Sequence, residues 1–209
     1  MKNFPFYRIT PHLKGSKGTF DDTFMTSEAT DRILKQNVIV QEKIDGINIG
    51  VYVDENDKFY LIQKNQILPK SAYSNFQEII TWFQQHQELI NKILKGKYAL
   101  FGEYLIGKST RKGLHKWVII DAIEISTNKF ISYPVLQSLA KSLKLEVTPI
   151  IFQGKLKKLS TVKTLINKSI YYSGLMEGVC IRIENSNHTI EKYKFVRENF
   201  EKNDITLSI

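Results

Sequence analysis

The sequence predicts an α+β domain in which mostly antiparallel sheets are flanked by helices. Strand-like segments, rich in β-branched and aromatic residues, come in neighbouring pairs, and single helical segments separate the pairs at irregular intervals. A doubly wound parallel sheet would instead require strand and helix to alternate regularly. Because the chain has 209 residues, 42% of them hydrophobic, and shows no internal repeat, we expect residues 1–209 to form a single domain.

The first third of the chain opens with a turn-rich stretch that Pro11, Gly15 and Gly18 punctuate. A short helix is expected next, over residues 27–36. The pattern then changes to apolar and β-branched residues with few helix formers between them. This change predicts three strands, at residues 38–41, 47–54 and 58–63.

The clearest helix is predicted over Ser74–Lys95, where apolar residues recur at helical spacing. Ser74 is the expected N-cap, and Gln77 follows it at the capping-box position. Gly96 comes directly after the last periodic residue and is expected to end the helix. This helix is interpreted as scaffold and carries no expected chemistry.

The rest of the chain predicts mainly strands, interrupted by two helices. Pro134 suits the first position of a helix that runs to about Leu143, and Ser160 is the expected cap of a second, short helix. Apolar runs with β-branched residues account for the other segments. These strands are expected at residues 97–105, 116–125, 147–152, 178–184 and 189–196.

The charge balance favours a polyanionic partner. Lys and Arg number 30 against 21 Asp and Glu, which gives a net charge of +9 and a pI near 9.4. Much of the surplus is local, because residues 141–168 carry seven lysines against one glutamate. This stretch is interpreted either as a phosphate-facing patch or as a solvated helix face.

The single cysteine, Cys180, lies in an apolar run and is interpreted as a core residue rather than a nucleophile. With one cysteine no disulfide can form within the chain, which indicates a reducing compartment. The N-terminus has no apolar run typical of a signal peptide, and no segment has the ~18 apolar residues of a membrane span. We therefore expect a cytoplasmic protein with no membrane partner.

Short charged stretches could carry chemistry, although each is ordinary by itself. Lys43 is flanked by carboxylates and followed by Gly46, a pattern that alone indicates a charged hairpin turn. In the last predicted strand Lys192 and Lys194 share one face, because strand side chains alternate. Alone, that strand is an amphipathic strand like many others.

The order of five such stretches is specific. They are Lys43–Gly46, Phe101–Glu103, Val118–Asp121, Glu177–Val179 and Lys192–Lys194. This series resembles the motifs of the covalent nucleotidyltransferase superfamily, which includes RNA ligases, ATP-dependent DNA ligases and mRNA capping enzymes. The resemblance extends from Glu42 to Val196, nearly the whole chain, and implies an ATP-grasp-like ligase domain.

Two further features favour the RNA ligase branch. Asn48 lies two residues after the motif glycine, where RNA ligases of the double-strand-repairing branch carry asparagine and DNA ligases usually carry arginine. The opening stretch Thr10–Ser16 also resembles the start of small bacterial and phage RNA-ligase-like proteins. The resemblance thus implies an ATP-dependent ligase whose partner is nucleic acid, and we expect that nucleic acid to be RNA.

The resemblance implies a three-step reaction with a covalent intermediate. The amine of Lys43 attacks the α-phosphate of ATP, releases pyrophosphate and becomes a lysyl-adenylate. The adenylyl group then moves to a 5′-phosphate, and a 3′-hydroxyl displaces AMP to seal the strand. The catalytic residues implied by the family motifs are Lys43, Asp45, Lys192 and Lys194, with Asp45 acting near the nick or in sealing.

The same motifs imply how the nucleotide and its metal are held. Glu177 is the expected ligand of Mg²⁺ or Mn²⁺, Glu103 would hold the ribose hydroxyls, and main-chain groups near Gln41–Glu42 would contact the adenine edge. Val179 and Ile120 are candidates for packing against the base. The full nucleotide-binding set is Gln41, Glu42, Lys43, Gly46, Asn48, Lys64, Glu103, Ile120, Glu177, Val179, Lys192 and Lys194.

Lys43 must lose a proton before it attacks, and we expect cations such as Lys192, Lys194 and Lys64 to lower its pKa. The sequence departs from the family at two places. Lys64 stands where the family has an arginine, so it keeps the charge but loses the planar fork. Ile120 stands where an aromatic residue often stacks on the base, which leaves the identity of the base open.

Other functions remain open on the sequence alone. The stretch Gly102–Ser109 matches the phosphate-loop pattern, but too few residues follow it for the ~10–12-residue helical crossover that such a loop opens. We therefore expect no phosphate loop, and Lys108–Lys116 is either a basic loop that touches nucleic acid or a solvated turn. A GTP-dependent capping guanylyltransferase, an ATP-dependent DNA ligase and a non-catalytic nucleic-acid-binding module are the alternatives.

After Lys194 only a short tail remains, so we expect no C-terminal oligonucleotide-binding (OB) barrel. Two arrangements follow. The chain is either a minimal, monomeric ligase that holds its substrate with its own basic surface, or an adenylating domain that depends on a helper domain or protein. In both, the expected partner is a nucleic acid with 5′-phosphate and 3′-hydroxyl ends.

Overall fold

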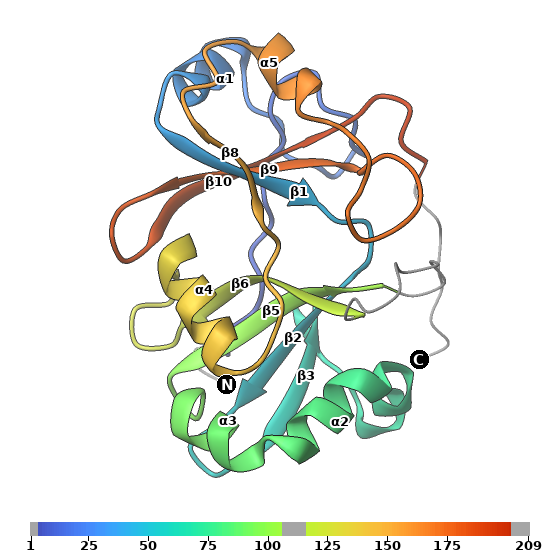
Figure 1. The fold of residues 1–209 in the computed structure, drawn as a ribbon, viewed down its shortest axis with the longest axis vertical. Coiled ribbons are helices and arrows are strands. Elements are labelled where there is room, and N and C mark those ends of the chain that lie inside the picture. The colour runs from blue at the N-terminus through green and yellow to red at the C-terminus, as the bar shows by residue number, and fades with distance from the viewer. Residues whose placement is uncertain (1–3, 106–115, 202–209) are drawn as a thin grey trace.

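Two open antiparallel sheets organise the chain, with helices on their outer faces (Figure 1). The computed structural model describes residues 4–105 and 116–201. All strand pairs within the two sheets are antiparallel, and neither strand order closes into a barrel in the described part. The predicted α+β class with antiparallel sheets is therefore confirmed.

The upper sheet in Figure 1 has four strands in the order β10-β9-β1-β8. Helices α1 (Ser27–Leu34) and α5 (Leu159–Thr164) pack on its outer face, over a core that includes Val40, Val162 and Phe195. The strands are β1 (Val38–Lys43), β8 (Ile150–Gly154), β9 (Gly178–Glu184) and β10 (Thr189–Val196).

The lower sheet has six strands in the order β4-β3-β2-β5-β6-β7. Helices α2 (Gln77–Gln85) and α3 (Gln87–Ile93) cover one face, together with α4 (Tyr133–Ser142), and a 3₁₀ helix spans Lys70–Phe76. The strands are β2 (Ile47–Val53), β3 (Phe59–Gln63), β4 (Gln66–Ile67), β5 (Tyr98–Tyr104), β6 (Trp117–Glu124) and β7 (Lys129–Phe130). The two-residue strands β4 and β7 were not predicted, because they are too short to show a periodic pattern.

The prediction of one helix over residues 74–95 was wrong, since the segment consists of a 3₁₀ helix and two short α-helices. His86 separates α2 from α3 with φ −127° and ψ 21°. A straight helix of this length would extend about 33 Å. The bend instead keeps Phe76, Trp82 and Ile90 in one core against the sheet. Ser74 lies inside the 3₁₀ helix and is not a cap.

Two other predicted element starts also differ. Ser160 does not cap α5, whose N-cap is Lys158 and which has no side-chain cap. The amide of Lys157 donates to the Leu34 carbonyl at 2.8 Å, and this contact with the end of α1 sets the start of α5. Strand β8 begins at Ile150 rather than residue 147, because Val147 still bridges Ile119 of the lower sheet.

The sheets are connected by the short link between β1 and β2 and by two longer segments. The chain after α4 leaves the edge of the lower sheet and rises to become β8 of the upper sheet (Figure 1). The N-terminal segment also runs from the lower sheet to the upper one. Phe4 packs on Tyr52 of β2, and the Leu13 amide donates to the Lys194 carbonyl of β10. None of the helices in residues 4–105 and 116–201 is long and apolar enough to cross a lipid bilayer.

Candidate functional site

A pocket of about 530 Å³ opens between the two sheets. The end of β1, the inner face of β10 and strands β2, β5 and β6 contribute to its walls, as does the N-terminal segment. The sequence-predicted residues that line it are Gln41, Glu42, Lys43, Asn48, Lys64, Glu103, Ile120, Lys192 and Lys194. Residues spread over most of the sequence therefore meet in one cavity.

Lys43 is the last residue of β1 and pairs in register with Gly178 of β9. Its Nζ lies 2.8 Å from Oε2 of Glu177, the residue just before β9, and both side chains are partly exposed. Strand pairing thus brings two motifs that are 134 positions apart into direct contact. The lysine and this carboxylate form an ion pair beside the pocket.

The glycines that follow the two charged residues allow close packing. A Cβ added at Gly178 would lie 1.9 Å from the main-chain oxygen of Phe195 in β10. One added at Gly46 would lie 2.9 Å from the main-chain oxygen of Tyr104 in β5. Real Cβ atoms do not approach so closely, so any side chain at these positions would push the strands apart and move Lys43.

Glu103 and Asn48 form a second polar group in the pocket, on neighbouring strands β5 and β2. The Asn48 side-chain amide donates to Glu103 Oε1 at 3.4 Å. Burial raises the pKa of Glu103 to about 7, with Lys43 lowering it and Glu177 raising it. The charges of both Glu103 and Glu177 therefore act on Lys43, and Glu177 makes the direct ion pair with it.

The expected lowering of the Lys43 pKa is not what this structure shows. Burial lowers the pKa of Lys43, but Glu177 and then Glu103 raise it, and the net result is a pKa above that of an ordinary lysine. The cations that were expected to oppose protonation have carboxylate partners of their own: Asp121 for Lys192 and Asp22 for Lys194. In this form Lys43 is a protonated, ion-paired amine.

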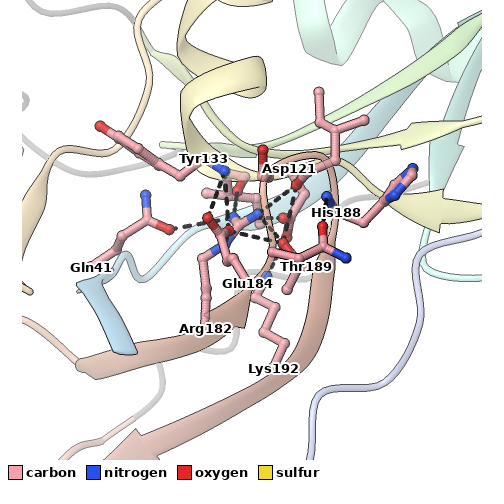
Figure 2. A network of polar contacts seen from close by, with 12 residues as sticks. Gln41, Asp121, Tyr133, Arg182, Glu184, His188, Thr189 and Lys192 are labelled. Atoms are coloured by element: carbon pink, nitrogen blue, oxygen red, sulfur yellow. Dashed lines mark hydrogen bonds and ion pairs between the residues drawn. The ribbon is translucent and has the colours of Figure 1, made fainter. Parts of the chain in front are cut away.

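Lys192 is held by a buried set of partners (Figure 2). Its Nζ contacts Oδ2 of Asp121 and the phenol oxygen of Tyr7, and the phenol in turn donates to Asp121 at 2.6 Å. Its side chain is 9% exposed, and Asp121 is fully buried. The neighbouring Tyr193 and Phe195 point into the opposite core, as the alternation of the strand predicted.

Arg182 anchors the other side of Asp121 (Figure 2). Its guanidinium group is fully buried and forms ion pairs with Asp121 at 2.8 Å and with Glu184 at 2.7 Å. It also donates to the side chains of Thr189 and Gln41. Because Arg182 and Thr189 belong to the upper sheet and Asp121 to the lower one, this network fastens the two sheets together beside the pocket.

Lys194 is paired near the mouth of the pocket. Its Nζ lies 3.1 Å from Oδ1 of Asp22, and Nε2 of the buried His12 lies 3.1 Å from the same oxygen. Burial raises the pKa of Asp22, but the Thr19 amide and Lys194 outweigh it, so the pKa of this carboxyl group falls far below its usual range. Asp22 is therefore ionised and neutralises one of the two β10 lysines.

Two predictions about the apolar side of the pocket need correction. Val179 is fully buried in the core of the upper sheet and is not a lining residue. Cys180, interpreted from the sequence as a core residue, lies on the pocket face instead. The reason is the register, which places Cys180 opposite both Gln41 and Lys194, whose side chains face the cavity. Ile120 lines the pocket as expected.

Besides Val179, three predicted residues (Asp45, Gly46 and Glu177) lie next to the pocket without lining it, whereas Gln41 and Glu42 do line it. Asp45 is buried near Tyr172, and Gly46 packs on β5. The side chains of Gln41 and Glu42 are occupied by the structure: Gln41 donates to the Thr148 carbonyl at 2.6 Å, and Glu42 accepts from Ser169 at 2.5 Å. Only their main-chain groups remain for the predicted contact with a base.

The phosphate-loop alternative does not fit the fold. Gly102 lies within β5, which pairs antiparallel with β6, whereas a phosphate loop joins a parallel strand to a helix. Lys108 and most of the predicted basic loop Lys108–Lys116 lie outside the described residues. Sequence reasoning missed Tyr7 and Asp22, which line the pocket. Family motifs do not include them, and the motif residues that they contact, Asp121 for Tyr7 and Lys194 for Asp22, are 114 and 172 positions away.

Solved structures of one enzyme resemble the fold. Naegleria gruberi RNA ligase with PPi matches with a TM-score of 0.63 and 19% identity, over 90% of this chain and 59% of that chain. A glutamate-to-alanine mutant of the same ligase, with ATP and Mn, matches with a TM-score of 0.60 and 17% identity, over 91% and 60%. The chain thus spans about three fifths of the length of these ligases.

A family model also matches the sequence itself. The model described as RNA ligase covers residues 36–195, which include Lys43, Glu103, Glu177 and both β10 lysines. None of the curated proteins matches the chain. Because the family model covers well over half of the sequence and the fold agrees with it, the chain belongs to the RNA ligase family.

Proposed function

We propose that this chain is the adenylyltransferase domain of an ATP-dependent RNA ligase that works through a lysyl-AMP intermediate. The observation that carries the proposal is the position of Lys43, whose amine contacts Glu177 and lines a pocket with Glu103, Lys192 and Lys194. Membership of the RNA ligase family supports the assignment, as does the ATP bound by a Naegleria ligase with this fold.

In the proposed first step the Lys43 nitrogen forms a bond to the α-phosphorus of ATP, and the bond to the pyrophosphate oxygen breaks. The amine loses its proton, and pyrophosphate leaves with the bonding electrons. Lys192 and Lys194 supply positive charge from one wall of the pocket, where it stabilises the phosphates in the transition state. Burial of Lys43 disfavours the charged amine, but Glu177 and Glu103 outweigh burial and keep the amine protonated in this form, so the effect of these carboxylates must weaken before Lys43 attacks.

The residues present fit a divalent metal. Among the described residues no cluster of three or more His, Cys, Asp or Glu side chains could enclose an ion. Mg²⁺ is nevertheless commonly held by one or two carboxylates together with substrate phosphates and water. Glu177, whose carboxylate lies 2.8 Å from Lys43 Nζ, would hold it here. The metal would neutralise charge on the ATP phosphates, and Mn²⁺ bound to a Naegleria ligase of this fold supports the assignment.

The remaining pocket residues are assigned to the ribose, the base and the outer phosphates of ATP. Asn48 and Glu103 lie together and are proposed to hold the ribose, and Ile120 with the main chain near Gln41 is proposed to hold the base. Lys64 at the pocket rim is proposed to contact the outer phosphates. Asp45 lies outside this pocket and is proposed to act in the later, nucleic-acid-dependent steps.

Covalent labelling tests the first step. The wild-type protein is incubated with ATP labelled at the α-phosphate and Mg²⁺, and label that survives denaturation is measured. We expect stoichiometric labelling of the wild type and none of Lys43→Ala. Lys64→Ala, which removes another pocket lysine, and Lys108→Ala serve as matched controls that still label. Absence of any adduct in the wild type would exclude the proposed mechanism, and labelling by GTP instead of ATP would favour a capping-type enzyme.

A sealing assay tests the substrate. We propose nucleic acid with 5′-phosphate and 3′-hydroxyl ends, and RNA in particular. Nicked duplexes with RNA or DNA at the 3′-hydroxyl end are compared, and faster joining of RNA ends is expected. Faster joining of all-DNA nicks would favour a DNA ligase. A chain that self-adenylates but joins no ends would instead indicate that a helper domain or protein is required.

A further inference from the structure

Residues 4–22 precede the part of the chain that the family model covers, yet they complete the pocket. Tyr7 lies in the wall, and its ring packs 5.1 Å from that of Phe101 and 5.3 Å from that of Phe130. These two rings belong to β5 and β7 of the lower sheet. The phenol is therefore fixed by packing before any polar contact is considered.

The phenol of Tyr7 and the side chain of Lys192 meet across the joint between the sheets. Lys192 Nζ contacts the phenol oxygen, and it also lies 5.0 Å from the centre of the Tyr7 ring and 5.6 Å from that of Phe130. Asp121 accepts from both partners, since the phenol donates to Oδ2 and Lys192 reaches the same oxygen. Lys192 is thus surrounded by two aromatic rings and a carboxylate.

We propose that Tyr7 is a positioning residue for the adenylation step, because its phenol and ring fix the Lys192 ammonium group at the point where it meets the ATP phosphates. An ammonium group has three donors, and within the described residues Asp121 and Tyr7 take two of them. The third is left for a phosphate oxygen in the pocket that Lys192 lines. Tyr7 itself does not touch the reacting atoms.

The protonation state of the phenol is consistent with this role. Burial raises the pKa of Tyr7 well above its ordinary value, and the charge of Asp121 adds to this effect. The phenol therefore keeps its proton and remains a donor to Asp121. Asp121 is held ionised by Lys192 and Arg182, which lower its pKa against the effect of burial. The hydrogen bond from Tyr7 adds to this effect but ranks behind Lys192 and Arg182, so Tyr7 acts on the group mainly through geometry.

The test substitutes Tyr7→Phe, which keeps the ring and its packing and removes only the hydroxyl. Tyr60→Phe is the matched control, because the Tyr60 phenol also donates to an aspartate, Asp54, at 2.9 Å, but it lies away from the pocket. Tyr7→Phe loses the contacts with Asp121 and Lys192 and Tyr60→Phe loses the one with Asp54, so the unfolding temperature of each variant is measured and the rates are compared well below both. Single-turnover labelling with ATP gives the maximal rate constant and the ATP concentration at half-maximal rate.

This inference rests on the proposed adenylation. We expect Tyr7→Phe to lower the maximal rate constant about 10-fold and to change the half-saturating ATP concentration less than twofold, because a loosened Lys192 weakens the transition state more than binding. Tyr60→Phe should match the wild type. Equal rates for Tyr7→Phe and wild type, or equal slowing by both variants, would overturn the role of Tyr7. A wild type that forms no adduct would contradict the proposed function instead.

Discussion

The pocket contains two lysine–carboxylate pairs that differ in their surroundings. Lys43 and Glu177 are both partly exposed, at 22% and 12% of their side chains, and their contact is a single one of 2.8 Å. Lys192 and Asp121 are 9% and 0% exposed. Asp121 is bonded in addition by Tyr7 and by the fully buried Arg182.

The difference separates a reactive lysine from a fixed one. A partly exposed pair with one contact is inexpensive to break, so Glu177 can exchange Lys43 for a metal or another cation. A buried pair inside a hydrogen-bonded network is costly to break, because each charge would be left without a partner. Substitutions in the first pair should therefore affect mainly activity, whereas those in the second should affect stability as well.

The largest effect is expected from Arg182→Met in the buried network. The change leaves Asp121 and Glu184 without their guanidinium partner and should lower the free energy of unfolding by about 3–5 kcal/mol. Urea denaturation measures the change. The control is Lys95→Met, which removes an exposed pair with Asp57 and should cost about 1 kcal/mol or less. Similar losses in both variants would mean that burial does not distinguish the pairs.

Glu177→Gln should instead lower activity strongly and change stability little. We expect the rate of adduct formation to fall about 100-fold, because the metal and Lys43 lose their carboxylate. The free energy of unfolding should change by about 1 kcal/mol or less, since the pair is partly exposed. Labelling kinetics and urea denaturation of the same preparation test both parts. A variant that is strongly destabilised but still forms the adduct at the wild-type rate would show that the Lys43–Glu177 pair serves stability rather than activity.

Glu103→Gln should change how stability depends on pH. The pKa of Glu103 is raised from 4.5 to about 7 by burial, so the folded protein holds this proton more tightly than the unfolded chain does. Its contribution to stability is therefore fully present below pH 4.5 and is lost as the pH rises through 7. At pH 8 Glu103→Gln should be more stable than the wild type by about 1–2 kcal/mol, although less active.

Denaturation of both proteins at pH 4.5 and pH 8 measures this effect. The advantage of Glu103→Gln should be confined to the higher pH, because the carboxyl group of the wild type is protonated at the lower one. An advantage of equal size at both pH values would show that packing, and not ionisation of Glu103, is responsible.

The smallest effect is expected at the pocket rim, where Lys64→Arg introduces the guanidinium group that is typical of the family. Lys64 is exposed, so its contact with phosphate is screened by water. We expect the half-saturating ATP concentration in labelling to fall about 2–5-fold, with an unchanged maximal rate. A half-saturating concentration that stays the same or rises would remove Lys64 from the proposed phosphate contacts.

Local patterns predicted the outline of this site well. The alternation of β10 correctly predicted that Lys192 and Lys194 share one face and that Tyr193 lies on the other, because side-chain direction in a strand follows from sequence position alone. The same rule did not decide which of Val179 and Cys180 lines the pocket. Alternation places them on opposite faces, but only the pairing of β9 with β1 decides which face looks into the pocket.

The charge pairing was the main feature that the sequence did not reveal. The sequence suggested a cleft of free cations that lowers the pKa of Lys43, whereas the structure pairs Lys43, Lys192 and Lys194 with carboxylates. Asp22 and Tyr7 lie outside every motif, and the lysines that they contact are 172 and 185 positions away. Motif reasoning identifies the lysines, and it does not identify what neutralises them.

By itself the sequence determined the antiparallel α+β class, the order of the family motifs and the side-chain faces within each strand. These properties depend on residues that are neighbours along the chain, so they can be read from local patterns. The tertiary structure decided the bend at His86, the register that turns Cys180 toward the pocket, and the partners of Lys43 and Lys192. Those depend on packing between segments far apart in sequence, where a shift of one residue in strand pairing would exchange the two faces.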